Sequence, residues 1–314
     1  MKAFALDEFG TQGSVRDVPD PEPGEGQVRI RVAAVGLNPF DNWVLQGALK
    51  DQMEHRFPLI PGSDASGTVD AVGPGVTDYT IGDDVFGSMG KSYFGEGALA
   101  ARGAMSTATI ARKPASLGHV EAAAIPVAGA TAKNMVEAAA IQDGHVVVLI
   151  GATGGVGSYF VQLATREGAR VVAVNSGENA DYARSLGAVD VIDYATGDVF
   201  EAVRDRLPDG IDAIADLHRD PELVARVAEL VRPGGHVVSA TGGVNVDALA
   251  KRGVEGVNVQ GRVSSDALAE LATLLEKKEI VSPEITTFRL DRANEAFALV
   301  GSGHVRGKVV VTLA

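Results

Sequence analysis

Short apolar segments recur along the chain, and their spacing changes near residue 120. The first part of the chain contains β-like segments separated by glycine and proline, at residues 2–6, 28–35, 68–72 and 84–86. Frequent Gly and Pro between short apolar segments are typical of a compact, mostly β domain. The sequence therefore predicts such a domain at the start of the chain.

Beyond residue 120 an alanine-rich stretch leads into apolar runs that alternate with segments of helical length. The predicted strands are 146–150, 170–174, 189–192, 211–216, 236–240 and 257–261, and the predicted helices are 156–167, 179–186, 199–206 and 222–231. Alternating strands and helices predict a parallel sheet covered by helices. These strands fit one doubly wound Rossmann sheet.

The C-terminal tail exceeds what this sheet requires. It contains a predicted helix at 266–277, an extended piece at 285–288, a second helix at 292–300 and a strand at 308–313. We expect the tail to return to the N-terminal domain, because chain termini often lie close together. The prediction is an α/β protein. Its mostly β domain comprises residues 1–118 and 265–314, and its Rossmann domain comprises residues 119–264.

A glycine-rich turn follows the first strand of the predicted Rossmann sheet. Gly151 permits a tight turn, Gly154 lets the backbone approach a pyrophosphate, and Gly157 lets the next helix pack close to the sheet. The helix N-terminus adds unpaired N–H groups and a partial positive charge. This turn predicts a dinucleotide site formed by Gly151, Thr153, Gly154, Gly155, Val156 and Gly157. No Gly-Lys-Ser/Thr follows, so it is not a Walker loop.

The end of the second Rossmann strand bears on which dinucleotide binds. In NAD-specific sites an acidic residue there holds the ribose 2′-hydroxyl. Here the strand ends at Asn175-Ser176, with Glu178 close behind and no Lys or Arg between Val171 and Ala183. A strand end that is neutral and carries a hydroxyl group leaves room for the extra phosphate of NADPH. The sequence therefore predicts NADPH over NADH.

Composition excludes several classes of function. The chain has no cysteine, which removes disulfides, thiol nucleophiles and cysteine-ligated metals, and which fits a reducing, cytoplasmic location. A formal net charge of −13 disfavours nucleic acid as a partner. No apolar run approaches the ~18 residues that a membrane span needs, and no export signal is visible at the N-terminus. The expected partner is a small molecule.

The pattern of polar residues excludes several kinds of catalytic site. The six histidines stand singly, with no His-Glu-x-x-His, so we expect no catalytic metal. No Gly-x-Ser-x-Gly marks an acyl-transfer serine. No tyrosine is followed four residues later by lysine, so the Tyr/Lys pair of short-chain reductases is absent.

Four ordered motifs span nearly the whole chain. They are residues 36–41 (Gly-Leu-Asn-Pro-Phe-Asp), 61–69 (Pro-Gly-Ser-Asp-Ala-Ser-Gly-Thr-Val), 126–132 (Pro-Val-Ala-Gly-Ala-Thr-Ala) and the glycine-rich turn. In these motifs the chain resembles the medium-chain dehydrogenase/reductase superfamily, in its zinc-independent quinone oxidoreductase branch, which includes zeta-crystallin. Asn38 and Ser63 stand where zinc-bearing relatives have a Cys and a His.

The resemblance implies a GroES-like domain, a Rossmann domain, a cleft between them, and NADPH-dependent reduction of quinones or α,β-unsaturated carbonyls. It implies that Asn38 and Asp41 lie beside the nicotinamide and position the reactants. The alternative for both residues is that they only form hydrogen bonds with the backbone of their own turn, as Asn and Asp commonly do. Further cofactor-lining positions implied by the resemblance are Thr131, Ser176, Asn179, Tyr194, Thr241 and Gly242.

Three residues depart from the pattern of this branch. Asn179 stands where a lysine often pairs with the 2′-phosphate, which weakens the predicted NADPH preference. Around Gly303 the chain lacks an arginine that often helps to hold the phosphate in this branch. Leu49 stands where many members have a tyrosine, a candidate proton donor in related enoyl reductases. The proton must then come from solvent or from another residue.

Two hypotheses of function follow. The first is a zinc-independent reductase that transfers hydride from NADPH to a quinone or an enone. The second is an NADPH-binding structural or sensing protein with little turnover. A zinc-dependent alcohol dehydrogenase would require metal ligands that the chain lacks. We also expect a homodimer, because edge strands such as 257–261 often pair across a two-fold axis.

Overall fold

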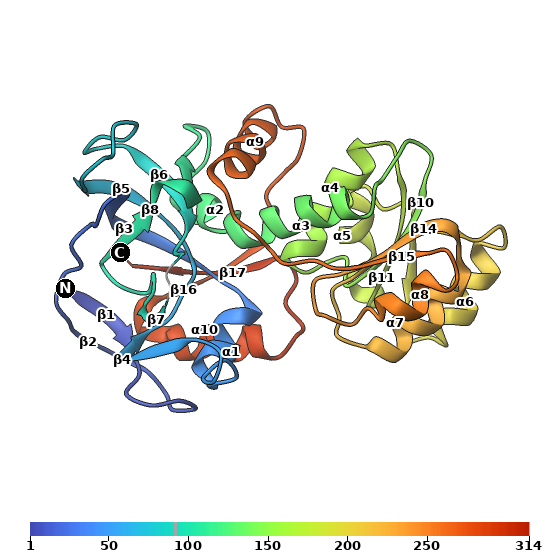
Figure 1. Cartoon of the computed structure of the whole chain (residues 1–314), viewed down its shortest axis with the longest axis horizontal. Helices are drawn as coiled ribbons and strands as arrows, with labels where there is room; N and C mark the ends of the chain where they lie inside the picture. Colours follow the sequence, from blue (N-terminus) through green and yellow to red (C-terminus); the bar gives the residue numbers. More distant parts are fainter. Residues whose placement is uncertain (91–92, 314) are drawn as a thin grey trace. The chain divides into compact units, whose positions relative to one another are not determined.

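The computed structural model describes residues 1–90 and 93–313 (Figure 1). The chain divides into two compact units, which we call unit 1 (Met1–Ala130 with Val263–Ala314) and unit 2 (Thr131–Arg262). Unit 1 is discontinuous in sequence, as predicted, because the C-terminal tail adds its last strand to the N-terminal sheet.

Unit 1 is built on a seven-stranded sheet in the order β16-β17-β3-β5-β6-β9, with β8 also pairing with β3. Two-stranded sheets join β1 to β2 and β4 to β7. The strands are β1 (Lys2–Ala5), β2 (Ser14–Asp17), β3 (Gln27–Leu37), β4 (Glu54–Ile60), β5 (Asp64–Val72), β6 (Asp84–Ser88), β7 (Tyr93–Glu96), β8 (Arg102–Ser106), β9 (Ile110–Arg112), β16 (Ile285–Arg289) and β17 (Lys308–Thr312). The helices are α1 (Pro39–Leu45), α2 (His119–Ala123), the first part of α3 (Pro126–Ala138), α9 (Ser265–Glu276) and α10 (Ala293–Gly301).

The alternation of side chains along β17 explains why the tail returns to this sheet. Successive side chains of a strand point to opposite faces. Val309 and Val311 belong to the main core of unit 1, whereas Val310 packs with Ala123 and Ala124 on the other face. Because both faces of β17 are buried, the strand is stable only inside the sheet. It lies antiparallel to β3, with Val309 opposite Leu37.

The boundary between the units differs from the predicted one, since it lies within α3 and not before α2. Helix α2 packs directly on β3. A Cβ atom at Gly36 would lie only 2.1 Å from the carbonyl oxygen of Ala123. The backbone N–H of Val127, at the start of α3, also bonds to Asp64 in β5. These contacts keep α2 and the first turn of α3 in unit 1.

Unit 2 is a six-stranded parallel sheet with the order β12-β11-β10-β13-β14-β15, which confirms the predicted Rossmann sheet. Strand β10 pairs with β11 on one side and with β13 on the other, so the strand order switches there. Doubly wound sheets bind ligands outside the carboxyl ends of the strands at such a point.

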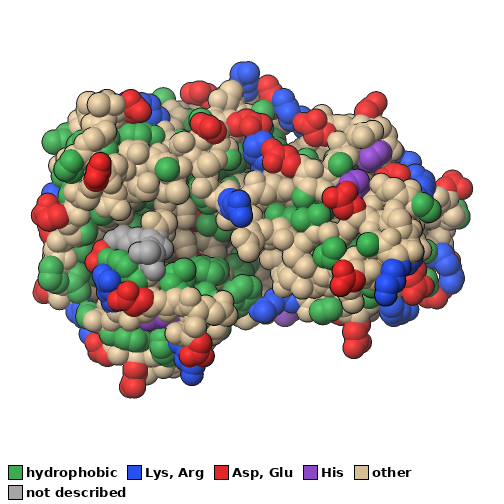
Figure 2. All heavy atoms as spheres, viewed as in Figure 1, with side chains coloured by type: hydrophobic (Ala, Val, Ile, Leu, Met, Phe, Trp, Pro, Cys, Tyr) green, Lys and Arg blue, Asp and Glu red, His purple; other side chains and the backbone are tan. Residues whose placement is uncertain are grey.

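The elements of unit 2 follow the predicted sequence of strands and helices. The strands are β10 (Val146–Ile150), β11 (Arg170–Asn175), β12 (Asp190–Asp193), β13 (Ile211–Asp216), β14 (Val231–Ser239) and β15 (Glu255–Asn258). The helices are α4 (Gly155–Arg166), α5 (Ala180–Ser185), α6 (Val199–Arg206), α7 (Pro221–Val227) and α8 (Val246–Ala250). On the face drawn in Figure 2, acidic and basic side chains are dispersed and do not gather into one patch.

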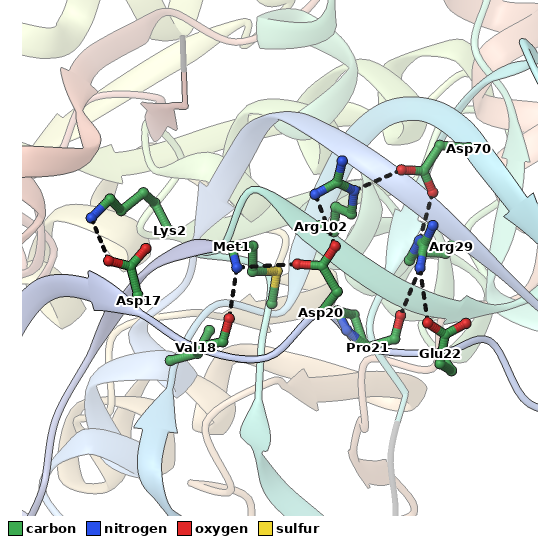
Figure 3. Close-up of polar contacts among 10 residues, drawn as sticks. All are labelled: Met1, Lys2, Asp17, Val18, Asp20, Pro21, Glu22, Arg29, Asp70 and Arg102. Carbon is green, nitrogen blue, oxygen red and sulfur yellow. Dashed lines mark hydrogen bonds and ion pairs between the residues drawn. The ribbon is translucent and has the colours of Figure 1, made fainter.

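An ion-pair ladder crosses the sheet of unit 1 (Figure 3). Asp70, on β5, accepts hydrogen bonds from the Nε atoms of Arg29 at 2.8 Å and of Arg102 at 2.9 Å. Arg102 also bonds to Asp20 at 3.0 Å. The Asp70 side chain is only 20% exposed, so this pair of contacts is partly shielded from water.

We predict that Asp70→Asn lowers the free energy of unfolding by about 1 kcal/mol, because it weakens two charge-assisted hydrogen bonds at once. Urea unfolding followed by circular dichroism measures the change. Asp17→Asn is the matched control, since Asp17 and its partner Lys2 are both largely exposed. Equal shifts of the unfolding midpoint for the two variants would show that the ion pairs of Asp70 stabilise the protein no more than the exposed pair of Asp17 and Lys2.

Candidate functional site

Five polar side chains of unit 1 lie together where strands β3, β5 and β17 meet helix α1. Asn38, Asp41, Asp64 and Lys308 are each no more than 5% exposed, and Ser63 is partly exposed. We call these five residues the buried cluster. Burying charges costs several kcal/mol unless each is paired and hydrogen-bonded, so the contacts of this cluster decide whether it is stable.

The ammonium group of Lys308 lies at the centre of these contacts. Its Nζ donates to the carbonyl oxygen of Leu37 at 2.8 Å and to Oδ1 of Asn38 at 2.5 Å, and it lies 3.6 Å from Oδ2 of Asp64. Lys308 was not among the predicted site residues. Strand alternation places it on the same face as Val310, which is buried, and this was the available signal for an inward-facing lysine.

The side-chain amide of Asn38 is oriented from both ends. Its Oδ1 accepts from Lys308, and its Nδ2 donates to Oδ2 of Asp64 at 3.0 Å. Asp64 also accepts the backbone N–H of Val127, at 3.2 Å from each carboxylate oxygen. Asn38 therefore does more than stabilise its own turn, since its side chain joins β5 to β17.

Asp41 combines turn chemistry with a contact to Ser63. Its Oδ2 accepts the backbone N–H of Asn38 at 2.8 Å, which is one half of a capping box at the start of α1. Its Oδ1 accepts the Ser63 hydroxyl at 2.6 Å. The turn interpretation thus holds for one oxygen of Asp41, and the other oxygen faces a partly exposed hydroxyl.

The buried cluster contains two carboxyl groups and one ammonium group. Burial raises the pKa of Asp64 to about 6, against the opposing effects of Lys308 and Asn38. Burial also raises the pKa of Asp41, against its hydrogen bond with Ser63. Burial lowers the pKa of Lys308, although both carboxylates attract its charge. Two acids with raised pKa values keep protons to higher pH than exposed carboxyl groups do.

The glycine-rich turn of unit 2 has the geometry of a phosphate-binding loop. Gly151 has a φ of +87°, and a Cβ at Gly157 would lie 2.3 Å from the carbonyl oxygen of Gly151. Helix α4 has Gly154 as its N-cap, and no side chain caps it. Its first N–H groups are therefore available to a pyrophosphate, so this turn fits the predicted dinucleotide.

At the carboxyl end of β11, oxygen acceptors gather. Asn175 donates from Nδ2 to the carbonyl oxygen of Ser176 at 2.8 Å, and its buried Oδ1 has no hydrogen-bond partner. The Ser176 hydroxyl oxygen accepts from Nδ2 of Asn179 at 3.1 Å. A Cβ at Gly177 would lie 2.4 Å from Oδ2 of Asp193, and Tyr194 next to it is exposed. An orphaned buried acceptor fits a ligand that brings hydroxyl donors, as a ribose does.

A second polar network holds the turn after β14. Asp216 is fully buried at the end of β13, and its Oδ2 accepts the hydroxyls of Ser239 at 2.7 Å and Thr241 at 2.8 Å. The N–H of Gly243 donates to the Ser239 hydroxyl at 3.3 Å. Asp216 and Ser239 were not predicted as site residues, although both end apolar strands.

The predicted residues are divided between the two units. Asn38 and Asp41 meet in the buried cluster of unit 1. Thr131 is buried at the start of unit 2, where Gly261 packs against its hydroxyl. The other predicted positions lie on the loops that follow β10, β11, β12 and β14 or in the first turn of α4, and they are Gly151, Thr153, Gly154, Gly155, Val156, Gly157, Ser176, Asn179, Tyr194, Thr241 and Gly242.

Two further findings concern residues 1–90 and 93–313. No group of three or more His, Cys, Asp or Glu side chains there could hold a metal ion. Within the same residues, no helix combines the length and the apolar character that a membrane crossing requires.

This chain is similar to known proteins over nearly its whole length. The family described as alcohol dehydrogenase GroES-like domain matches residues 24–166, and the family described as zinc-binding dehydrogenase matches residues 186–311. Quinone-oxidoreductase QR1, chloroplastic, of Triphysaria versicolor is 30% identical, over 99% of this chain and 98% of its own length. The NADPH-dependent alkenal/one oxidoreductase, chloroplastic, of Arabidopsis thaliana is 31% identical, over 99% of this chain and 79% of its own length.

A solved structure extends this similarity to the fold. The quinone oxidoreductase from Coxiella burnetii superimposes with a TM-score of 0.90 at 29% identity, over 100% of this chain and 99% of its own. Sequence motifs, fold and full-length relatives agree. The chain is therefore an oxidoreductase of the medium-chain dehydrogenase/reductase superfamily and belongs to its quinone oxidoreductase branch.

Proposed function

We propose that this protein reduces a quinone or an α,β-unsaturated carbonyl compound with a hydride from a nicotinamide dinucleotide, without zinc. The observation that carries the proposal is the buried cluster. Asn38 and Ser63, at the positions of metal ligands in zinc-bearing relatives, are here bonded to Lys308 and Asp41. The printed names of the quinone and alkenal/one oxidoreductases support the substrate class.

In this proposal each unit has its own task. The bound dinucleotide supplies the hydride, and the uncapped N–H groups of α4 hold its pyrophosphate. Asn38 polarises the substrate carbonyl, and Asp64 orients its amide by accepting a hydrogen bond from Nδ2. The charge of Lys308 on Oδ1 strengthens that donor. A pre-oriented donor of this kind stabilises the oxyanion that develops during hydride transfer.

The second candidate function is binding of the dinucleotide without turnover. Leu49, at the position where many members of the branch have a tyrosine, packs against the core of unit 1 and offers no proton. Under this alternative the glycine-rich turn would still bind the dinucleotide, and the buried cluster would serve only stability.

The choice of cofactor is part of the proposal. The predicted NADPH is supported by the neutral Ser176, by Tyr194 and by the printed name of the alkenal/one oxidoreductase. Asn179 supplies no positive charge and instead donates to Ser176. We therefore propose NADPH as the reductant with a modest preference over NADH, and a cytoplasmic location in keeping with the absence of cysteine.

We predict that the protein oxidises NADPH when an aromatic ortho-quinone or a simple cyclic enone is added, because the cluster and the glycine-rich turn supply both halves of the reaction. Nicotinamide fluorescence measures binding, and absorbance measures oxidation in the same sample. Binding without oxidation by either substrate would favour the second candidate, and failure to bind either dinucleotide would overturn both.

We predict that Asn179→Lys tightens the binding of NADPH about tenfold, which corresponds to about 1.4 kcal/mol, because it adds one charge-assisted contact to the 2′-phosphate. Titration by nicotinamide fluorescence measures both dissociation constants. NADH binding should change little, and Asn179→Gln is the control that extends the side chain without charge. Equal tightening for both dinucleotides would show that residue 179 does not face the 2′-position.

We also propose a homodimer that pairs through the edge of the Rossmann sheet. Strand β15 has β14 as its one neighbour in the described sheet, so its other edge carries unpaired backbone groups. Sedimentation equilibrium is expected to give twice the chain mass at micromolar concentration. A stable monomer under those conditions would contradict the prediction.

A further inference from the structure

Ser63 is the point at which the buried cluster reaches the surface of unit 1. The other four members are no more than 5% exposed, whereas Ser63 is partly exposed. Its backbone is held in place, because its carbonyl oxygen accepts the N–H of Met89 at 2.7 Å. Its hydroxyl lies 2.6 Å from Oδ1 of Asp41. A hydrogen bond thus leads from a buried carboxyl group to the hydroxyl of a partly exposed residue.

The two carboxyl groups of the cluster differ in their partners. Asp64 has the ammonium of Lys308, the amide of Asn38 and the N–H of Val127 around it. Asp41 has the backbone N–H and the side-chain amide of Asn38 and the Ser63 hydroxyl, and no ion pair joins it to a cation in the described part of the chain. A buried carboxyl group without a paired cation favours its neutral form. Asp41 is therefore the member that can both hold a proton and pass it outward.

The charged groups that face Asp41 come from two strands. Lys308 lies on β17 and favours the ionisation of Asp41. Asp64 lies on β5, and the charge of Asp41 raises the pKa of Asp64. Helix α1 has no titratable residue besides Asp41 itself. Helix α10 packs on α1, but its Glu295 is exposed and paired with Arg292.

We propose that the Ser63 hydroxyl, backed by the Asp41 carboxyl group, is the proton donor that completes the reduction of an enone. This inference rests on the proposed function and supplies the group that Leu49 cannot supply. Hydride adds to the β-carbon with its electron pair, and the electrons of the C=C bond move onto the carbonyl oxygen as an enolate. The Ser63 proton goes to the α-carbon, Ser63 regains a proton from Asp41, and water reprotonates Asp41.

The surroundings of the cluster suit an apolar substrate. Phe40 lies between Asn38 and Asp41 in the first turn of α1 and is 37% exposed. Its ring centroid is 5.7 Å from that of Phe94 and 6.4 Å from that of Trp43. An exposed aromatic surface on the first turn of α1 fits a cyclic enone better than a charged substrate.

The test compares two substrates of the intact protein, 2-methylcyclohex-2-enone and an aromatic ortho-quinone. The reduced enone must gain a proton on carbon, and solvent delivers such a proton slowly. A reduced quinone takes its protons on oxygen, and solvent delivers these fast. We expect Ser63→Ala to lower the ratio of enone to quinone turnover about 100-fold, in the range of general acid catalysis. It should also make the 2-methylcyclohexanone product nearly racemic, since no enzyme group then chooses the face of protonation.

Ser63→Thr keeps a hydroxyl and should restore both the ratio and the stereochemistry. A purely structural role for Ser63 would not require this recovery. Asp41→Asn should lower the ratio as Ser63→Ala does. In the unaltered protein, enone turnover should fall as rising pH removes the proton of Asp41, and Asp41→Asn should abolish this fall. Equal loss of both activities in Ser63→Ala, or an unchanged product stereochemistry, would overturn the inference. Reduction of the quinone but not the enone by the unaltered protein would overturn this inference alone. No reduction of either substrate would overturn the proposed function as well.

Discussion

The buried ammonium group of Lys308 is the interaction on which the organisation of unit 1 depends. It is held by a backbone carbonyl of β3, by the Asn38 amide and by the Asp64 carboxylate. A lysine is stable at that depth only if all of these partners are present, because an unpaired buried charge is strongly destabilising. The last strand of the chain must therefore lie against β3, and the discontinuity of unit 1 follows from this pairing. The same contacts orient Asn38, so one charge supports both the fold and the site.

In both units, a buried aspartate at one terminus of a strand holds a neighbouring segment by hydrogen bonds. In unit 1, Asp64 at the start of β5 fixes Asn38 and the first turn of α3. In unit 2, Asp216 at the end of β13 fixes the hydroxyls of Ser239 and Thr241 and thereby the turn after β14. Such networks restrict the rotamers of the groups that they hold, which is what a pre-organised site requires. In unit 1, Asn38 is held by such a network.

The sequence allowed the architecture to be predicted, and it singled out Asn38 and Asp41 of the buried cluster. The Rossmann strands, the glycine-rich turn and the returning tail follow from local patterns, namely apolar alternation, glycine spacing and segment length. The structure contains all of these elements, although β14 begins before the predicted strand 236–240 and β15 ends before the predicted end at 261. Lys308, Asp64 and Asp216 act through partners far away in sequence, and Lys308 lies 270 residues from Asn38. No local pattern reports such pairings. The domain boundary was misplaced for a related reason, since α2 joins unit 1 through the close approach of Gly36 to Ala123.

The buried cluster is expected to retain a proton at a pH where exposed carboxyl groups have lost theirs. The most direct measurement is a titration of the carboxyl carbons of Asp41 and Asp64 by ¹³C NMR, assigned with Asp41→Asn and Asp64→Asn. We expect a midpoint of about 6 for Asp64, and a midpoint for Asp41 above the ordinary value of 3.8. Midpoints at or below 3.8 for both residues would show that Lys308 fully offsets burial, and would contradict the account.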